Sequence, residues 1–255
     1  MNRLLPLAAL VAATVALPSA AQGATLERYS GISGTMQLTA APAETNLITV
    51  EDRPGSVVIT DNAGPLTLKR AHGCLRLDSI SARCFLTNQV WLDLGDGNDV
   101  ATIASRREVS VNGGAGDDRY NAVATDTRSR VDFFGGFGVD VASYFYATEG
   151  VRVGVDGMPF DGRRGDNDRI DRTVETVLGS QFDDVLTGAS REQQLFGFDG
   201  DDEIAGGKGS DVLDGGSGDD RIDARDGELD TIDCGIGMLD VLTADPVESS
   251  ILGCP

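Results

Sequence analysis

Aspartates that end glycine-rich turns are the residues of this chain best suited to hold a metal ion. At Gly206 and Gly215, two adjacent glycines, a variable residue and a third glycine come shortly before an aspartate. Glycine reaches positive φ and lets the backbone approach a ligand, so the carbonyl groups of such a turn can point inward. The aspartate adds a charged oxygen, and hard cations such as calcium take about six to eight oxygen ligands. The pattern therefore predicts turns that bind calcium.

The turns recur with a period of nine residues between Gly179 and Asp233. The sixth position of each block is acidic with one exception, and the eighth is always aliphatic. In chain order the sixth positions are Asp184, Gln193, Asp202, Asp211 and Asp220, and the eighth positions are Leu186, Leu195, Ile204, Leu213 and Ile222. A fixed period is typical of a repeat architecture. Each turn is followed by a minimal strand whose middle side chain faces inward, which predicts a thin aliphatic core between two sheets.

Four segments match one known repeat pattern. They are GGAGDDRYN at Gly113, GGFGVDVAS at Gly135, GGKGSDVLD at Gly206 and GGSGDDRID at Gly215. These segments resemble the RTX, or hemolysin-type, calcium-binding repeat, whose pattern is GGxGxDxUx. The resemblance implies an all-β fold, a parallel β-roll (β-solenoid), with several Ca²⁺ ions held between successive turns. A flexible linker rich in glycine and aspartate is the alternative, but it predicts no aliphatic residue at a fixed phase.

The predicted metal site residues are the aspartates and glycines at the matching turn positions. The aspartates are Asp99, Asp118, Asp140, Asp184, Asp202, Asp211, Asp220 and Asp230, and the glycines are Gly113, Gly116, Gly135, Gly138, Gly197, Gly200, Gly206, Gly209, Gly215 and Gly218.

Two nine-residue blocks would make one flattened coil, so residues eighteen positions apart should stack. The expected edges are Asp184, Asp202 and Asp220 on one side and Asp211 and Asp230 on the other. Gln193 stands where the second block needs an acid. That block is therefore expected to keep its coil and lose its ion.

The chain divides into five segments by composition and rhythm. Residues 1–23 have an Arg3 head, an apolar run and small residues, which together predict a signal peptide and a secreted, extracellular protein. Residues 24–89 alternate like strands and predict a β-rich N-terminal cap. Residues 90–178 are expected to form a solenoid with calcium turns on one edge and a solvated insertion at 156–168. Residues 179–243 hold the tandem repeats, and residues 244–255 form a C-terminal cap.

The insertion and the aromatic residues each leave two interpretations open. Asp156, Asp161, Asp166 and Asp168 could hold another cation, yet their spacing is not that of an EF-hand loop. The aromatic residues between Phe133 and Tyr146 are expected to pack in the core or at its edges, and a ligand-binding platform is the alternative.

The net charge of the chain limits the kinds of partner that it can bind. The formal net charge is −20, which argues against nucleic acid or an anionic membrane and favours cations. The apolar run near the start is shorter than the ~20 residues that span a bilayer, and no later segment is apolar enough, so no transmembrane segment is expected. Calcium is the expected partner, and cell-surface glycans or proteins are possible further ones.

The four cysteines are expected to form disulfides because the protein is predicted to be exported. Three pairings are possible, but Cys74 and Cys84 lie close together near one end, and Cys234 and Cys254 near the other. We expect these two local pairs. A zinc site is a poor alternative because no cysteines are closely spaced and His72 is the only histidine.

An enzymatic activity is the alternative to calcium binding alone. A polysaccharide lyase, epimerase or hydrolase is the strongest enzymatic alternative, because paired acids cleave glycosides and some β-solenoids act on polysaccharides. The acidic residues stand mostly at the turn positions expected for calcium ligands. The sequence has no HExxH, GxSxG or P-loop motif. We therefore expect a calcium-binding protein with a structural, adhesive or surface-associated role, and not an enzyme.

Overall fold

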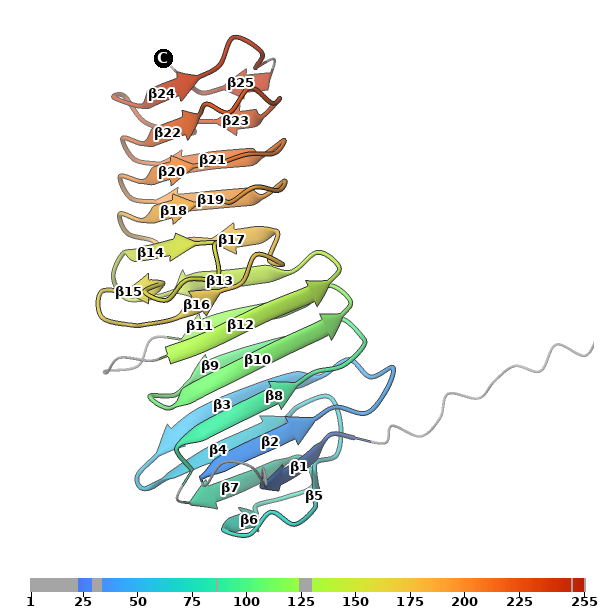
Figure 1. The fold of residues 1–255 in the computed structure, drawn as a ribbon. Helices are drawn as coiled ribbons and strands as arrows, with labels where there is room; N and C mark the ends of the chain where they lie inside the picture. Colours follow the sequence, from blue (N-terminus) through green and yellow to red (C-terminus); the bar gives the residue numbers. More distant parts are fainter. Residues whose placement is uncertain (1–22, 29–33, 86, 124–129, 249, 255) are drawn as a thin grey trace, which may run out of the picture.

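The computed structural model describes residues 23–28, 34–85, 87–123, 130–248 and 250–254. The predicted signal peptide lies outside these ranges, apart from Gly23. The described part is an elongated stack of coils, with the early strands at one end and the C-terminal strands at the other (Figure 1). It contains strands and no helix, which confirms the all-β prediction. Accordingly, these ranges hold no helix long and apolar enough to cross a membrane.

Three sheets make up the stack. Sheet A contains β1 (Thr25–Arg28), β2 (Thr35–Thr39), β5 (Thr67–Leu68), β8 (Gln89–Asp93), β10 (Glu108–Ala115), β12 (Arg130–Phe137) and β16 (Arg169–Ile170). Sheet B contains β3 (Leu47–Arg53), β4 (Ser56–Asp61), β6 (Cys74–Arg76), β7 (Ser81–Phe85), β9 (Val100–Ala104), β11 (Arg119–Val123), β13 (Val141–Tyr146), β17 (Thr176–Leu178), β19 (Gln194–Asp199), β21 (Val212–Ser217), β23 (Thr231–Asp233) and β25 (Ser250–Leu252). Sheet C contains β14 (Val151–Gly154), β15 (Gly162–Arg163), β18 (Val185–Thr187), β20 (Glu203–Ala205), β22 (Arg221–Ala224) and β24 (Val241–Ala244).

The repeat coils alternate between sheets B and C through parallel pairs in strict register. Leu186 pairs with Ile204, and Ile204 pairs with Ile222. Leu195 likewise pairs with Leu213 in sheet B. All five of these side chains are fully buried. A slip of one residue would turn each aliphatic side chain outward, so the thin core fixes the register.

The N-terminal segment combines antiparallel hairpins with the first coil. β3, β4, β7 and β6 pair antiparallel in that order. Meanwhile β2 pairs parallel with β8, and β3 pairs parallel with β9. The coil thus starts at Thr35, within the segment that the sequence assigns to the cap. The disulfide between Cys74 and Cys84 joins opposite residues of β6 and β7, as predicted.

The face opposite sheet B is broken at the insertion. Sheet A ends at β16 and sheet C begins at β15 and β14, whereas sheet B continues without interruption. The prediction of a solvated insertion is wrong for Asp161, Asp166 and Asp168, which are at most 6% exposed. At the break, Asp161 accepts hydrogen bonds from the backbone N–H groups of Gly154 and Ile170. These carboxylates replace part of the hydrogen bonding that a continuous sheet would supply.

Aromatic side chains fill the wider coils beside the insertion. Tyr120, Phe133 and Tyr144 are buried, and the Tyr120 ring lies 5.7 Å from Phe133 and 6.0 Å from Tyr144 between centroids. The Tyr144 hydroxyl donates to Asp168 Oδ2 at 3.2 Å. Phe137 and Tyr146 are exposed. Core packing therefore explains only some of the aromatic residues in this stretch.

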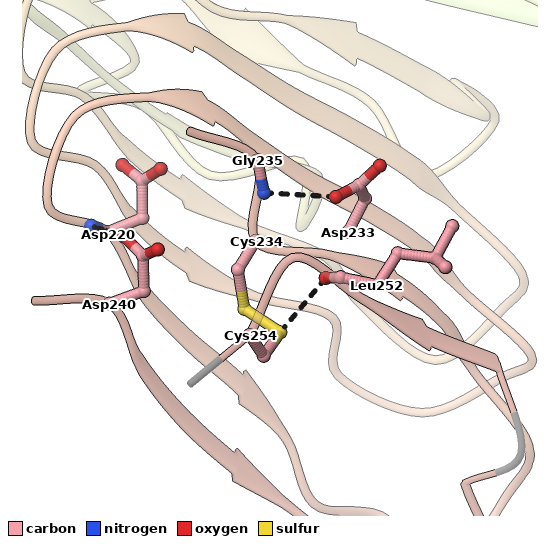
Figure 2. The surroundings of a disulfide bond; sticks show 7 residues. All are labelled: Asp220, Asp233, Cys234, Gly235, Asp240, Leu252 and Cys254. Atoms are coloured by element: carbon pink, nitrogen blue, oxygen red, sulfur yellow. Dashed lines mark hydrogen bonds between the residues drawn. A yellow bond between two sulfur atoms is a disulfide. The ribbon is translucent and has the colours of Figure 1, made fainter. Parts of the chain in front are cut away.

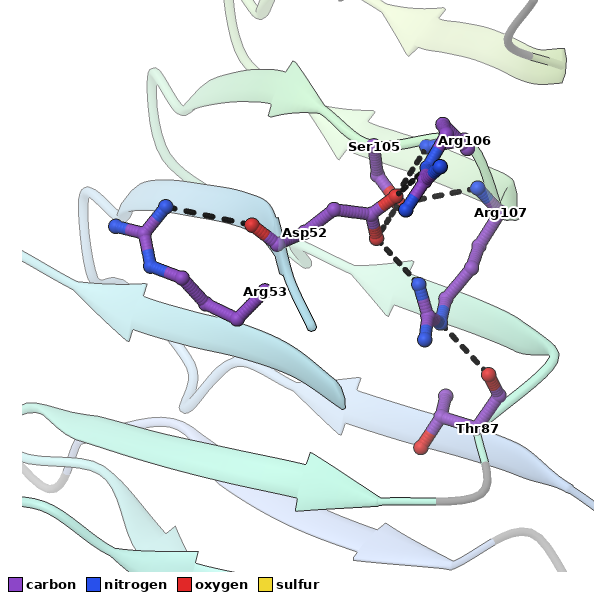
Figure 3. A network of polar contacts seen from close by, with 6 residues as sticks. All are labelled: Asp52, Arg53, Thr87, Ser105, Arg106 and Arg107. Atoms are coloured by element: carbon purple, nitrogen blue, oxygen red, sulfur yellow. Dashed lines mark hydrogen bonds and ion pairs between the residues drawn. The ribbon is translucent and has the colours of Figure 1, made fainter. Parts of the chain in front are cut away.

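An ion-pair network closes one side of the early coils (Figure 3). Asp52, at the end of β3, accepts hydrogen bonds from Ser105 and Arg106 and pairs with Arg107. Arg107 also donates to the Thr87 carbonyl at 2.7 Å. Burial opposes ionisation of Asp52, but the Arg106 hydrogen bonds and the Arg107 charge outweigh it and lower its pKa. The turn between β9 and β10, which contains Ser105, Arg106 and Arg107, has no glycine–aspartate pattern, as expected for the edge without calcium turns.

Candidate calcium sites on the two edges

Carboxylates form a ladder along the first edge, which is the edge where the chain enters sheet B. The backbone N–H of Asp99 donates to Asp118 Oδ1 at 2.9 Å, and the N–H of Asp118 donates to Asp140 Oδ1 at 2.9 Å. Further along, the N–H of Gln193 donates to Asp211 Oδ1, and that of Asp211 donates to Asp230 Oδ1, both at 2.8 Å. Each of these aspartate side chains thus reaches back to the previous coil.

The second edge, where the chain leaves sheet B, carries a separate ladder in the repeat coils. The N–H of Asp184 donates to Asp202 Oδ1 at 2.7 Å, and the N–H of Asp202 donates to Asp220 Oδ1 at 2.9 Å. The ladder ends at Asp240, whose Oδ1 accepts from the N–H of Asp220. The predicted division of the aspartates between two edges is therefore what the structure shows.

The turn glycines make room for these aspartates. A Cβ atom at Gly197 would lie 2.0 Å from Asp202 Oδ2. Five other first-position glycines face the aspartate of their own turn at 2.3 to 2.5 Å in the same way: Gly113, Gly135, Gly179, Gly206 and Gly215. The fourth-position glycines, Gly116, Gly138, Gly200, Gly209 and Gly218, have φ between +123° and +140°. Their backbones pass against the preceding coil: a Cβ at Gly218 would lie 2.0 Å from the Gly200 carbonyl oxygen.

Most ladder aspartates keep one oxygen without a hydrogen-bond partner. Oδ1 accepts the backbone N–H of the neighbouring coil, and Oδ2 is buried and unpaired. This holds for Asp99, Asp118, Asp140, Asp202, Asp211 and Asp220. A buried unpaired carboxylate oxygen is costly unless a cation or a donor satisfies it. The residues therefore fit a bound Ca²⁺, which prefers such oxygens.

The ladder environment also raises the pKa of these carboxyl groups. Burial, followed by repulsion from neighbouring carboxylates, raises the pKa of Asp118 and of Asp202 to about 7. Burial is likewise the largest cause for Asp211 and Asp230, whose pKa rises to about 6. Hydrogen bonds from the backbone oppose the rise without cancelling it. Without a cation, the stacked negative charges are thus disfavoured.

Two members of the ladders differ from the rest. Asp184 Oδ2 accepts a hydrogen bond from the Ser180 N–H at 2.5 Å, and Oδ1 accepts one from the Ser180 hydroxyl at 2.8 Å. Its carboxylate is therefore satisfied within its own turn. Gln193 is buried, and its Oε1 accepts the Ala189 N–H at 3.0 Å. An amide thus holds this turn closed where the other turns have a carboxylate.

Three further acids, Glu175, Asp240 and Glu248, belong to the ladders but are not among the predicted site residues. Glu175 Oε2 accepts the Asp140 N–H at 2.9 Å, and Glu248 Oε2 accepts the Asp230 N–H at 2.6 Å. Asp240 extends the second edge. The turns that end at Glu175 and Glu248 contain no glycine, and the turn that ends at Asp240 has two glycines outside the GGxGxD spacing. The signal that could have found Glu175 is an acid directly before a three-residue strand with a buried middle position.

Side chains alone do not complete a calcium site. In the described ranges, no group of three or more histidine, cysteine, aspartate or glutamate side chains could hold a metal ion. Calcium takes about six to eight oxygens, so the turn carbonyls have to supply most of them. The ladder aspartates would hold the ion from adjacent coils, and the bound ion would supply the positive charge between their carboxylates.

The C-terminal disulfide lies beside the last step of the second edge (Figure 2). Cys234 pairs with Cys254, as predicted, and Cys234 is buried directly after β23. The Asp220–Asp240 hydrogen bond lies next to it. The final coil is therefore fastened covalently at the end of the stack.

A stack of parallel coils with carboxylate ladders at both edges defines a calcium-binding β-roll. The family model of the RTX calcium-binding nonapeptide repeat, in 4 copies, matches residues 196–228. These residues include the turns that end at Asp202, Asp211 and Asp220. The match confirms the resemblance for this segment: residues 196–228 contain RTX-type calcium-binding nonapeptide repeats, and Ca²⁺ is the ion that such repeats bind. No curated protein matches the chain.

Proposed function

We propose that this chain is exported and acts outside the cell as a structural, adhesive or surface-associated module whose coils fold when Ca²⁺ binds. One observation carries the proposal: on both edges, buried aspartate oxygens without a partner are repeated from coil to coil. Two disulfides and a predicted signal peptide favour an oxidising, extracellular setting. Glycans or proteins of the cell surface would be its partners.

Electrostatics gives the reason for coupling between folding and binding. Two carboxylates about 5 Å apart, at an effective dielectric of about 20, repel by ~3 kcal/mol. A divalent cation between them reverses the sign of that interaction. Extracellular calcium modules bind at about 10⁻⁴ to 10⁻³ M, and Ca²⁺ at about 100 times Kd would add ~2.7 kcal/mol per site. Several sites in series would favour the folded coils strongly.

Catalysis is not part of this proposal. Asp161 and Asp168 are buried acids away from the edges, and both accept hydrogen bonds within the chain. Burial raises the pKa of each to about 7. Their oxygens are engaged by backbone N–H groups and by the Tyr144 hydroxyl, which suits a structural role at the sheet break.

Circular dichroism of the mature chain during a calcium titration from excess chelator tests the proposal. We expect β-structure to increase cooperatively as Ca²⁺ is added, with a smaller response to Mg²⁺, which demands stricter octahedral geometry. Full β-structure in chelator, unchanged by calcium, would overturn it. Incubation with a panel of polysaccharides tests the non-enzymatic part, and turnover of any member would contradict it.

A further inference from the structure

A groove on the outer face of sheet B lies beside the turns of the second edge. Its volume is about 360 Å³, and its apolar side is formed by Phe145 of β13, Phe196 and Phe198 of β19, and Ile236. Leu195 and Leu213 point into the core, so the alternate residues Phe196 and Asp214 face outward. None of these groove residues is one of the predicted calcium site residues, although Phe198 and Asp199 lie between Gly197 and Gly200 of one predicted calcium turn.

The phenyl rings of the groove contact one another. The Phe145 and Phe198 rings meet edge to face, with 5.2 Å between centroids, and Phe196 stacks on Phe198 at 6.5 Å. β13 and β19 are separated by β17 in the sheet, so side chains from non-neighbouring strands converge here. The rings form one continuous aromatic surface.

Phe198 adopts a backbone conformation that suits glycine. Its φ is +81°, and the equivalent residue of the next coil, Gly216, has φ +99°. For a bulky residue this region costs on the order of 1–2 kcal/mol. The side chain lies at the groove and not in the core. The phenyl side chain therefore occupies a position that the fold would favour for glycine, and it packs on the rings of the groove and not in the core.

The polar lining of the groove is acidic. Asp199 and Asp214 line it together with Gln181 and Ser217, and no lysine or arginine does. Asp233 pairs with Asp214 in the neighbouring strand and adds a third carboxylate close by. The carboxylates of the groove therefore favour a cationic partner.

We propose that this groove binds a basic segment of a partner protein, with the stem of an arginine or lysine on the Phe145–Phe196–Phe198 surface and its charged head at Asp199 and Asp214. Long basic side chains bury their methylene stems on apolar surfaces, and cations are attracted to aromatic faces. Carboxylates then pair with the head group. The inference rests on the proposed function, because the groove belongs to coils that we propose to fold with calcium.

Titration with a short synthetic peptide that alternates arginine and leucine tests the site by isothermal calorimetry in saturating Ca²⁺. We expect Phe198→Gly, and separately the pair Asp199→Asn and Asp214→Asn, to weaken binding about tenfold. Phe198→Gly is expected to leave folding intact because glycine favours this φ. The exposed Met238, outside the groove, gives the control variant Met238→Ala with unchanged binding.

Three outcomes would overturn the site: no binding of the peptide, equal binding by all variants, or binding of a neutral cello-oligosaccharide in its place. Circular dichroism on the same samples separates this proposal from the calcium one. A chain that folds without calcium and still binds the peptide contradicts only the calcium proposal. A chain that folds with calcium and ignores the peptide contradicts only the groove.

Discussion

The backbone N–H of Asp202 donates to Oδ1 of Asp220 at 2.9 Å, and Oδ2 of Asp220 is left buried without a partner. One side chain thus links two coils with one oxygen and presents the other to the turn. Repetition of this arrangement makes each aspartate part of the fold and of the calcium site at once.

Asp202→Asn should lower calcium stoichiometry and weaken the remaining binding about tenfold, since calcium affinity depends on ligand charge. The amide oxygen can still accept the Asp184 N–H, so the coil should persist. The matched control is Asp201→Asn, which removes the same charge from an exposed neighbour. Calorimetric titration with Ca²⁺ measures both, and equal losses would show that the assigned register is wrong.

Asp184→Asn should have a smaller effect on calcium binding than Asp202→Asn. Ser180 already donates to both oxygens of Asp184, so a cation would have to compete with these hydrogen bonds. We expect the calcium stoichiometry to stay within error of the unmodified chain. A loss as large as that of Asp202→Asn would show that Ser180 releases the carboxylate.

The stability of the calcium-free chain should fall as pH rises from about 4 to about 7. The folded state raises the pKa of Asp118 and Asp202 to about 7, whereas an unfolded aspartate titrates near 3.9. Between those values the folded state holds more protons, so the free energy of unfolding decreases with pH. Circular dichroism in chelator across this range measures the folded fraction, and a folded fraction that rises with pH would contradict it.

Saturating calcium should reverse that pH dependence. Calcium needs ionised carboxylates, so its binding weakens as pH falls through about 7 to 6 and the ladder aspartates take up protons. The same circular dichroism series with Ca²⁺ serves as the internal control. Identical curves in both conditions would mean that the ladder carboxylates do not bind the ion.

Gly197→Ala should destabilise the calcium-loaded chain by about 1–3 kcal/mol, because the added methyl group would overlap Asp202 Oδ2. Gly64→Ala is the matched control: the nearest atom would lie 3.7 Å away, and its φ is not positive. Thermal unfolding compares the two. A neutral Gly197→Ala would show that the turn can open without cost.

Asp161→Ala should cost about 2–4 kcal/mol, because the buried N–H groups of Gly154 and Ile170 would lose their acceptor. Asp156→Ala, at an exposed position of the same insertion, should change stability by less than about 0.5 kcal/mol. Chemical unfolding in calcium measures both variants. Similar stability losses for the two variants would show that the insertion is a solvated loop.

The nine-residue repeat made the coil geometry predictable from the sequence. The break between sheet A and sheet C could not be predicted in the same way. A nine-residue period places Leu186, Ile204 and Ile222 inward and divides the aspartates between two edges, because geometry repeats with sequence. The burial of Asp168 depends on tertiary contacts with Val131 and Tyr144, far away in the chain. Glu175 continues a ladder without any glycine pattern, so its position directly before a three-residue strand was the one local signal that marked it.

The continuity of sheet B has a mechanical consequence. At the level of the insertion, strand pairing crosses from the early coils to the repeat coils on one side only, through β13 and β17. On the opposite side, the Asp161–Asp168 bridge and the Asp161 carboxylate, which accepts from the N–H groups of Gly154 and Ile170, connect β16 to β14. Loss of that carboxylate would leave the two halves of the roll joined chiefly through sheet B, so the calcium-rich half should then tilt more easily toward or away from the broken face.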